Sequence, residues 1–428
     1  MHLWRLLLLC LLPALAAAAD PHDPVISGFS AVFGIRVEFI LFAATLLGVA
    51  LFHRFALAIA AGGLAAIALW CLTCSGFAEG HGVSGLAHHL GHAWVLLANL
   101  LLLLTGFEIL AHHFTASRLP AILPRLLPRG RLGAIAILAI VFVLSAILDN
   151  IAAALIGATI AATAFRGKVH VGYLAAIVAA ANAGGAGSVV GDSTTTMIWL
   201  AGHSPFSVLH AYVGAVVAFL IAAWIASGQQ HRLQPVAPAP GSDGAHDHID
   251  LRALGVVVLV LAAAIGTNLA LNLWAHDAVD LAPWIGLAVW AALIVVAPWR
   301  GLPVAVLPHA AKGAAFLLCL VLAASCMPVA GLPAATQTTT AGLGLVSAVF
   351  DNIPLTALAL QQGGYDWGLL AYAVGFGGSL IWFGSSAGVA VAGQFPAAGS
   401  AIAWIRHAWY LPIAYAAGII AMVVLGAG

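Results

Sequence analysis

The chain has 428 residues, of which 63% are hydrophobic and 7% are charged, and its formal net charge is zero. A soluble domain could not bury so much apolar surface, and a neutral chain without a basic stripe offers no electrostatic case for binding nucleic acid. The successive apolar runs of about 17–25 residues predict an all-α polytopic protein of a lipid bilayer.

Residues 1–19 have the pattern of a secretory signal peptide, with one basic residue, Arg5, a leucine-rich core and four small residues at 16–19. An uncleaved signal anchor is the alternative. Residues 232–251 are rich in Pro, Gly and Asp and cannot pack a core, which indicates a linker. The sequence therefore predicts a first transmembrane repeat over 20–231, a cytoplasmic linker over 232–251 and a second transmembrane repeat over 252–428.

Two loops of the first half differ in charge. The stretch 76–92 holds four histidines without Lys or Arg and is interpreted as a solvated loop, with a pH-sensing role left open. The stretch 111–131 holds four arginines and is cytoplasmic by the positive-inside rule, which places the mature N-terminus outside. The expected spans of this half are 37–52, 55–74, 93–110 and 205–226. Those of the second half are 254–273, 283–298, 314–332 and 408–425.

A carboxylate beside an amide occurs twice within apolar runs, as Asp149-Asn150 and Asp351-Asn352. The first run, 132–165, has basic residues at both ends, which places both ends in the cytoplasm, and it is too short for two full spans. We therefore expect a re-entrant hairpin with Asp149-Asn150 at its tip. The second run has no basic residue at its mouth and opens outward, which predicts inverted topology. Helix capping alone is the plainer interpretation of both aspartates.

Each hairpin is followed by an apolar segment that glycines interrupt, and glycine is a poor helix former. The first break carries Asn182, Asp192, Thr194 and Thr195, whereas the second has Ser385 where Asp192 stands in the first. We therefore expect two broken transmembrane helices. Their hinge or unwound backbone is predicted at Gly184, Gly185, Gly191, Gly377, Gly378 and Gly384.

The membrane interior thus contains three carboxylates and no Lys or Arg at comparable depth. Oxygen ligands of this kind suit a small hard cation, whereas an anion would be repelled. Burial favours the neutral form of a carboxylate, so a proton and a cation compete for the same oxygens. The candidate cation- and proton-binding residues are Asp149, Asn150, Asn182, Asp192, Thr194, Thr195, Asp351, Asn352 and Ser385.

The remaining reactive side chains have plainer interpretations. Glu108 is expected to snorkel or to pair with His112 rather than to take part in transport, and Glu38 is expected to pair with Arg36. The Cys71–Cys74 spacing lacks further metal ligands, so the thiols are interpreted as small hydrophobes. No cofactor and no enzymatic activity are expected.

Residues 182–199, from Asn182 through Asp192 to Trp199, resemble the motif of the NhaD-type sodium/proton antiporters, a family of the citrate transporter-like ion transporter superfamily. The departures from that motif, at 187, 189 and 193, leave Asp192 and the threonines at 194–196 in place. Residues 347–354 and 377–389 resemble the second-half motifs of the same family. The resemblance implies two inverted repeats, often in a homodimer, in the bacterial inner membrane. It also implies exchange of Na⁺ or Li⁺ for H⁺ by alternating access, with the cation at Asp149, Asp192 and Asp351.

Two other functions stay open. One is a Na⁺- or H⁺-coupled organic-anion or arsenite-type carrier of the same superfamily, which predicts Ser/Thr tips and donor-rich surroundings. The other is a non-transporting membrane scaffold or sensor, which predicts that the buried acids are dispensable.

Overall fold

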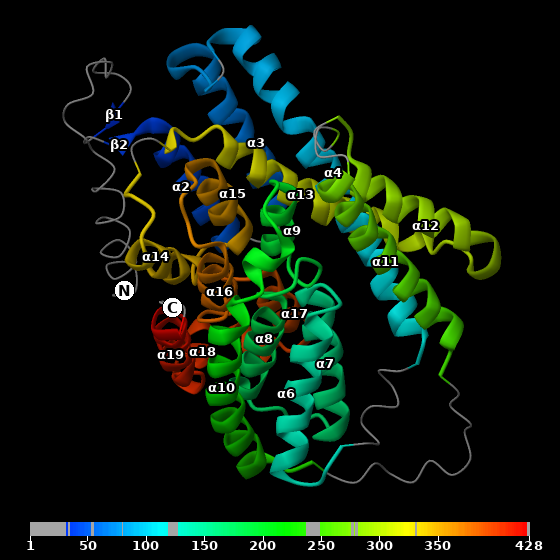
Figure 1. Ribbon diagram of the computed structural model, residues 1–428. Coiled ribbons are helices and arrows are strands. Elements are labelled where there is room, and N and C mark those ends of the chain that lie inside the picture. Colours follow the sequence, from blue (N-terminus) through cyan, green and yellow to red (C-terminus); the bar gives the residue numbers. More distant parts are fainter. Residues whose placement is uncertain are drawn as a thin grey trace.

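The computed structural model describes residues 31–32, 35–52, 55–78, 80–118, 127–236, 249–274, 278, 281–329 and 332–425. The predicted signal peptide and residues 237–248 of the predicted linker lie outside these ranges. The described chain is almost entirely helical (Figure 1), and its one sheet is a short antiparallel pair, β1 (Ala31–Val32) and β2 (Ile35–Arg36). Five stretches are long and apolar enough to cross a membrane, in agreement with the predicted all-α polytopic class: Ala56–Ser75, Gly82–Ala116, Pro205–Leu233, Leu251–Asn268 and Val304–Ser325.

The helices follow the apolar runs of the sequence. Those of the first half are α2 (Val37–Leu51), α3 (Ala56–Trp70), α4 (Gly82–Ala116), α6 (Arg131–Ser145), α7 (Asn150–Ala164), α8 (Val171–Gly185), α9 (Ser193–Leu200) and α10 (Ala211–Leu233). Those of the second half are α11 (Leu251–Trp274), α12 (Trp284–Arg300), α13 (Leu307–Ser325), α14 (Gln337–Ser347), α15 (Asn352–Gln362), α16 (Trp367–Gly377), α17 (Ser386–Gln394), α18 (Ala401–His407) and α19 (Tyr410–Leu425).

Helix α4 corrects one expectation. It is a single helix of 35 residues that starts at Gly82, so residues 82–92 of the stretch interpreted as a histidine-rich loop are its first three turns. No proline interrupts 82–116, and the apolar residues between the histidines let the helix run on. His88 and His92 are exposed, whereas His89 is buried: its Nε2 lies 2.8 Å from Ser325 Oγ of α13, and its ring stacks on Phe77.

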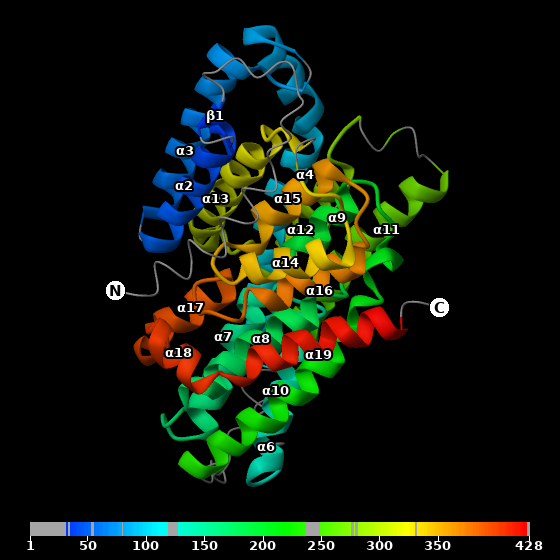
Figure 2. The ribbon, with the colours of Figure 1, turned by 90° about the vertical axis from the view of Figure 1, so that its left-hand side faces the viewer.

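The helices pack in groups around two apolar clusters. One cluster joins α2, α3 and α13 with α15, and the other is centred on α8, which α6, α7 and α10 surround. Every residue of α8 from Gly172 to Gly185 is buried, and most are Ala or Gly, whose small side chains let neighbouring backbones approach closely. Helices α11 and α12 lie beside α4 at the edge of the molecule (Figure 1), and α19 runs along α10 (Figure 2).

Each half has a close backbone contact at the end of the helix that precedes its break. A Cβ added to Gly184 of α8 would lie 2.0 Å from the Phe142 carbonyl oxygen of α6, and one added to Gly377 of α16 would lie 2.0 Å from the Gly344 carbonyl oxygen of α14. Only glycine fits such an approach. The glycine pairs that recur in the sequence therefore seat the broken helices against the helices that lead to the Asp-Asn tips.

Candidate functional site

Asp149 and Asp351 both begin the helix that follows the tip. Asp149 precedes α7, and its Oδ2 accepts a hydrogen bond from Ile151 N at 3.1 Å; Asp351 precedes α15, and its Oδ1 accepts from Ile353 N at 3.2 Å. Their backbone angles are nearly identical, with φ/ψ of −54°/144° and −54°/145°. Both aspartates therefore cap helices, as the plainer interpretation predicts. Capping occupies only part of each carboxylate, and the second oxygen of Asp351 accepts from Ser386 Oγ at 2.7 Å.

Asp192 lies in the break between α8 and α9, where the first residues of α7 and α15 both contact it. Its side chain is 1% exposed. The amide of Asn150, the first residue of α7, donates to its Oδ1 at 3.3 Å, and the amide of Asn352, the first residue of α15, donates to Oδ1 and Oδ2 at 3.3 and 3.2 Å. Within the described part of the chain no Lys or Arg pairs with this carboxylate. The acid is thus held by neutral donors alone, which leaves its charge for a cation or a proton.

Asn182 joins the two broken helices. Its Oδ1 accepts from the Asn150 amide at 3.1 Å, and its own Nδ2 donates to Ser379 Oγ at 2.9 Å and Ser385 Oγ at 3.2 Å. Ser385 Oγ also accepts from Gly388 N and so caps α17. The structure thus brings Asn150, Asn182, Asp192, Asn352 and Ser385 into one buried hydrogen-bond network.

The threonines after Asp192 have different surroundings. The Thr195 hydroxyl donates to the carbonyl oxygens of Ser188 and Asp192, at 2.5 and 2.8 Å, and so holds the break in shape. Thr194 is 0% exposed, and its hydroxyl lies close enough to the Asp192 carboxylate to interact with it, although the geometry falls short of a well-formed hydrogen bond. A buried hydroxyl without a full hydrogen bond costs free energy unless a ligand or water satisfies it. The Thr194 oxygen is therefore the hydroxyl oxygen best placed to join Asp192 in binding a cation.

The glycines divide between helix ends and breaks. Gly191 and Gly384 lie in the non-helical segments, and Gly378 is the first residue beyond α16. Gly184, Gly185 and Gly377 instead lie in the last turns of α8 and α16, so the expectation of unwound backbone is wrong for these three. Close packing explains them better, because an added Cβ on Gly185 would lie 2.7 Å from the Gly191 carbonyl oxygen.

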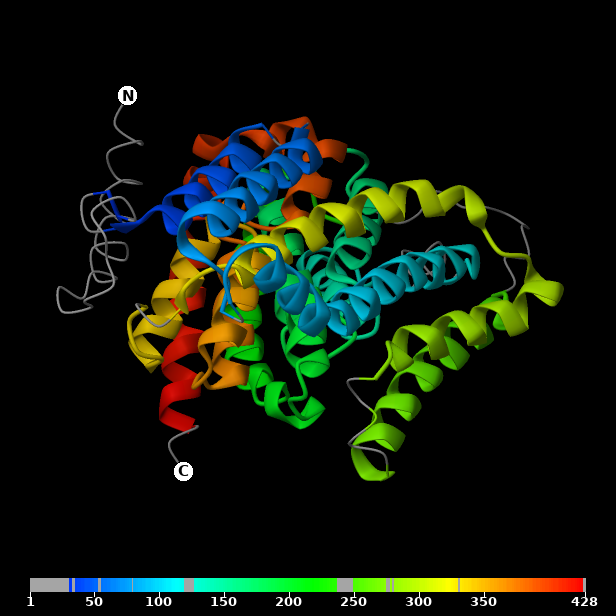
Figure 3. The same ribbon diagram turned by 90° about the horizontal axis from the view of Figure 1, so that it is seen from above.

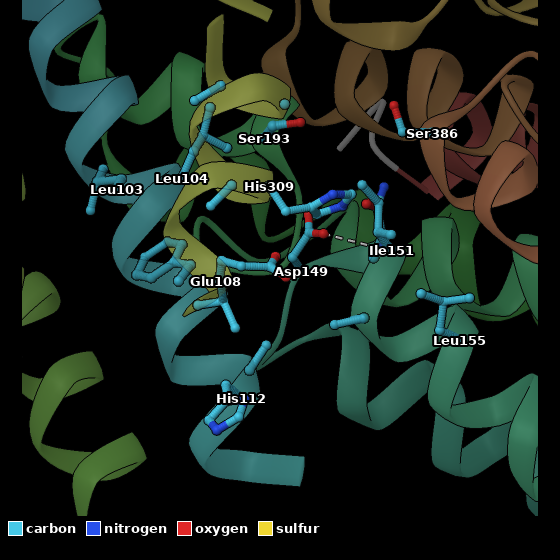
Figure 4. A pocket seen from close by; sticks show the side chains of 18 of the residues that line it. Leu103, Leu104, Glu108, His112, Asp149, Ile151, Leu155, Ser193, His309 and Ser386 are labelled. Atoms are coloured by element: carbon cyan, nitrogen blue, oxygen red, sulfur yellow. Dashed lines mark hydrogen bonds between the residues drawn. The ribbon is translucent and has the colours of Figure 1, made fainter. Parts of the chain in front are cut away.

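A cavity of about 890 Å³ leads to the tips. Its walls come from α4 and α13 on one side and α7 on the other (Figure 4), and Asn150, Ser193 and Asn352 lie at its inner end. At its other end it is lined by Thr115 of α4 and Thr163 of α7, close to the arginine-bearing segments that the sequence places in the cytoplasm. The cavity thus runs from the buried candidate site to exposed residues at the ends of α4 and α7.

Among the described residues, Glu108 does not form the pair with His112 that the sequence suggested. It lines the cavity, and no hydrogen bond or ion pair joins it to His112 in the described structure; Figure 4 shows its side chain pointing toward Asp149. An acid without a partner inside an apolar span is the sequence signal that could have identified it. The expected pairing of Glu38 with Arg36 is confirmed, at 3.1 Å.

The comparisons with known proteins point to one group of transporters. A protein of Arabidopsis thaliana named sodium/proton antiporter 2 is 28% identical over 285 residues, which are 58% of this chain and 66% of the relative. Proteins named Na⁺/H⁺ antiporter NhaD from Vibrio parahaemolyticus and Halomonas elongata are 27% and 26% identical over 304 and 302 residues, 59% of this chain in each case.

These matches cover 71% of the Vibrio protein and 59% of the Halomonas protein. A second Arabidopsis thaliana protein, named sodium/proton antiporter 1, is covered to 49%, so the chain spans between about half and two thirds of the length of most of these relatives. No protein-family model matches the chain. The relatives carry the name that the motif around Asp192 predicts, and the chain is similar in sequence to the NhaD-type sodium/proton antiporters.

Proposed function

We propose that the protein is a secondary transporter that exchanges Na⁺ or Li⁺ for H⁺ across the bacterial inner membrane by alternating access. The observation that carries the proposal is Asp192, a buried carboxylate held by two amides, without a basic partner among the described residues. A buried charge needs a compensating partner, and here a cation or a proton can serve. The names of the relatives support the same substrates and argue against an enzyme.

The proposed architecture is two inverted repeats, each with a re-entrant hairpin and a broken helix. Three features support it: the matching caps at Asp149 and Asp351, the matching glycine contacts of α8 and α16, and the breaks that separate α8 from α9 and α16 from α17. Segments 20–231 and 252–428 are the proposed repeats, with 232–251 as the cytoplasmic linker. Inverted repeats with discontinuous helices place a binding site at mid-membrane depth.

The donor and acceptor pattern favours a cation over an organic anion. An anion needs free N–H donors, but the Asn150 and Asn352 amides already donate to Asp192, and the Asn182 amide donates to two serines. The groups left to a ligand are oxygens: those of the three aspartates and the Thr194 hydroxyl. Such a set suits a hard cation.

The test is ΔpH dequenching in everted vesicles, with Na⁺, Li⁺, K⁺ and citrate added in turn. We expect a response to Na⁺ or Li⁺ in the wild type and its loss in Asp192→Asn and Asp351→Asn. No cation response in the wild type refutes the exchanger, and a response to citrate favours the anion carrier. Full activity of both variants refutes the assignment of the site, whereas a wild type that responds to none of the four additions supports a scaffold.

A further inference from the structure

A second carboxylate faces the tip of the first hairpin across the cavity. Glu108 lies on α4, which packs against α11, α12 and α13, whereas Asp149 begins α7, which packs against α6, α8 and α17. Seen from above, α4 crosses the molecule beside α11 and α13 (Figure 3). The two acids therefore belong to different groups of helices, and the cavity lies between them.

The titratable groups around the cavity are few. Besides Glu108 and Asp149 they are His112 of α4 and His309 of α13, and no Lys or Arg is among the described residues that line it. In Figure 4 the Glu108 carboxylate and the His309 ring both point toward Asp149. Most of the remaining lining is apolar, with threonines on α4 and α7. A cleft of one charge sign with low-dielectric walls concentrates counter-ions.

The position of Glu108 is not explained by stability. A carboxylate in a span is costly, and structural acids in membranes pair with a basic group. Glu38 shows the structural case in this chain, since it is 1% exposed and pairs with Arg36. Glu108 instead has no ion-pair partner among the described residues and is exposed to the cavity. We therefore infer that the Glu108 carboxylate interacts with the ions that enter the cavity.

We propose that Glu108 is a further carboxylate of the transport path, which captures the cation or the proton from the cavity and passes it to Asp149. The proposal rests on the proposed exchange and adds a residue to it. Its location on the wall opposite Asp149 means that relative movement of the two helix groups would separate the acids.

The transport test compares two substitutions at Glu108: Glu108→Gln removes the charge at equal size, and Glu108→Asp keeps it. The control is Asp366→Asn, which removes an exposed carboxylate that lies outside the cavity and bonds His210. We expect Glu108→Gln to raise the half-saturating Na⁺ concentration by about threefold or more and to flatten the pH profile, because one attracting charge is lost. Glu108→Asp recovers most of the affinity, and Asp366→Asn matches the wild type. An unchanged half-saturating concentration and pH profile in Glu108→Gln overturn the proposal.

A second measurement does not depend on transport. In a variant without native cysteines, Glu108→Cys is treated in everted vesicles with membrane-impermeant thiosulfonates that are cationic or anionic. We expect faster reaction with the cationic reagent, because Asp149 is close, and slower reaction when Na⁺ is present. Absence of modification overturns the proposal even if the protein exchanges Na⁺ for H⁺. Modification slowed by Na⁺, in a protein whose wild type shows no exchange, supports the cation path and refutes the proposed exchange.

Discussion

The side-chain amide of Asn352 donates to both oxygens of Asp192, at 3.3 and 3.2 Å, from a position 160 residues further along the chain. Asn352 is the first residue of α15, in the second half, and it therefore holds Asp192, which immediately precedes α9 in the first half. Neither half contains the site by itself. Any change of contact between α15 and α9 alters the donors that Asp192 receives.

Replacement of Asp192 by Asn tests the central acid. We expect Na⁺-dependent exchange to fall by about 100-fold or more, because a neutral amide can neither release a proton nor balance a desolvated cation. The measurement is the initial rate of dequenching at saturating Na⁺, corrected for the amount of protein in the vesicles. Thr73→Val, at an exposed position just after α3 and outside the cavity lining, is the control for a polar change and should retain most of the rate. More than half of the wild-type rate in Asp192→Asn would contradict the assignment.

The glycine contacts predict matched losses of stability in the two halves. Gly184→Ala and Gly377→Ala each place a methyl group 2.0 Å from a carbonyl oxygen, so we expect each to cost about 1–3 kcal/mol. The control is Gly266→Ala on α11, where an added Cβ meets nothing within 4 Å and helix propensity favours alanine by about 1 kcal/mol. Thermal unfolding in detergent measures all three. A tolerated Gly377→Ala beside a damaging Gly184→Ala would argue against equivalent packing in the two halves.

Asp250 links α11 to α12 and predicts a pH dependence. The backbone N–H of Ala253 and the Arg300 guanidinium, at 2.7 Å, hold the pKa of Asp250 below its ordinary value of 3.8. A lowered pKa in the folded state means that the contribution to stability is present above the unfolded value and is lost as the pH falls through the folded one. We expect Asp250→Asn to lower the unfolding temperature at pH 7.

Below about pH 4 the wild type loses the same interaction, so the difference between the two proteins should shrink. Arg252→Gln, which changes an exposed neighbour, is the control and should stay within about 0.5 kcal/mol of the wild type. A gap between Asp250→Asn and the wild type that widens in acid would contradict the direction of the pKa change.

His89 distinguishes the buried histidine of α4 from its exposed neighbours. His89→Ala removes the hydrogen bond to Ser325 and the stacking on Phe77, and we expect a loss of about 1–3 kcal/mol. His88→Ala and His92→Ala, on exposed positions of the same helix, should be nearly neutral. Thermal unfolding of the three variants is the measurement. Equal effects at all three positions would contradict the helical arrangement.

Several elements were predictable from local patterns. The Asp-Asn pairs predicted the starts of α7 and α15 because an aspartate followed by a short apolar run is a helix-start signal in any context. The glycine runs predicted the breaks after α8 and α16 because glycine disfavours helix wherever it stands. The membrane class followed from composition alone.

Other features depended on distant parts of the chain. Histidines suggested a loop at 76–92, but residues 82–92 are helical and His89 packs against α13, a contact between distant parts of the chain that the sequence pattern does not show. Gly184 and Gly377 looked like hinges, whereas the carbonyl groups of α6 and α14 show that close packing requires them. Nothing in the sequence indicated that Glu108 points toward Asp149 across the cavity, because the two residues are 41 positions apart.

The sequence by itself thus determined the class of protein, the helix starts after the two Asp-Asn pairs and the two breaks, because each is a property of neighbouring residues. Only the tertiary structure decided that Asn150 and Asn352 meet at Asp192, that the buried Thr194 hydroxyl lies beside the same carboxylate, and that Glu108 faces Asp149. The physical reason is that hydrogen bonds and cavities depend on which helices pack together. That choice is made by apolar surfaces summed over the whole chain.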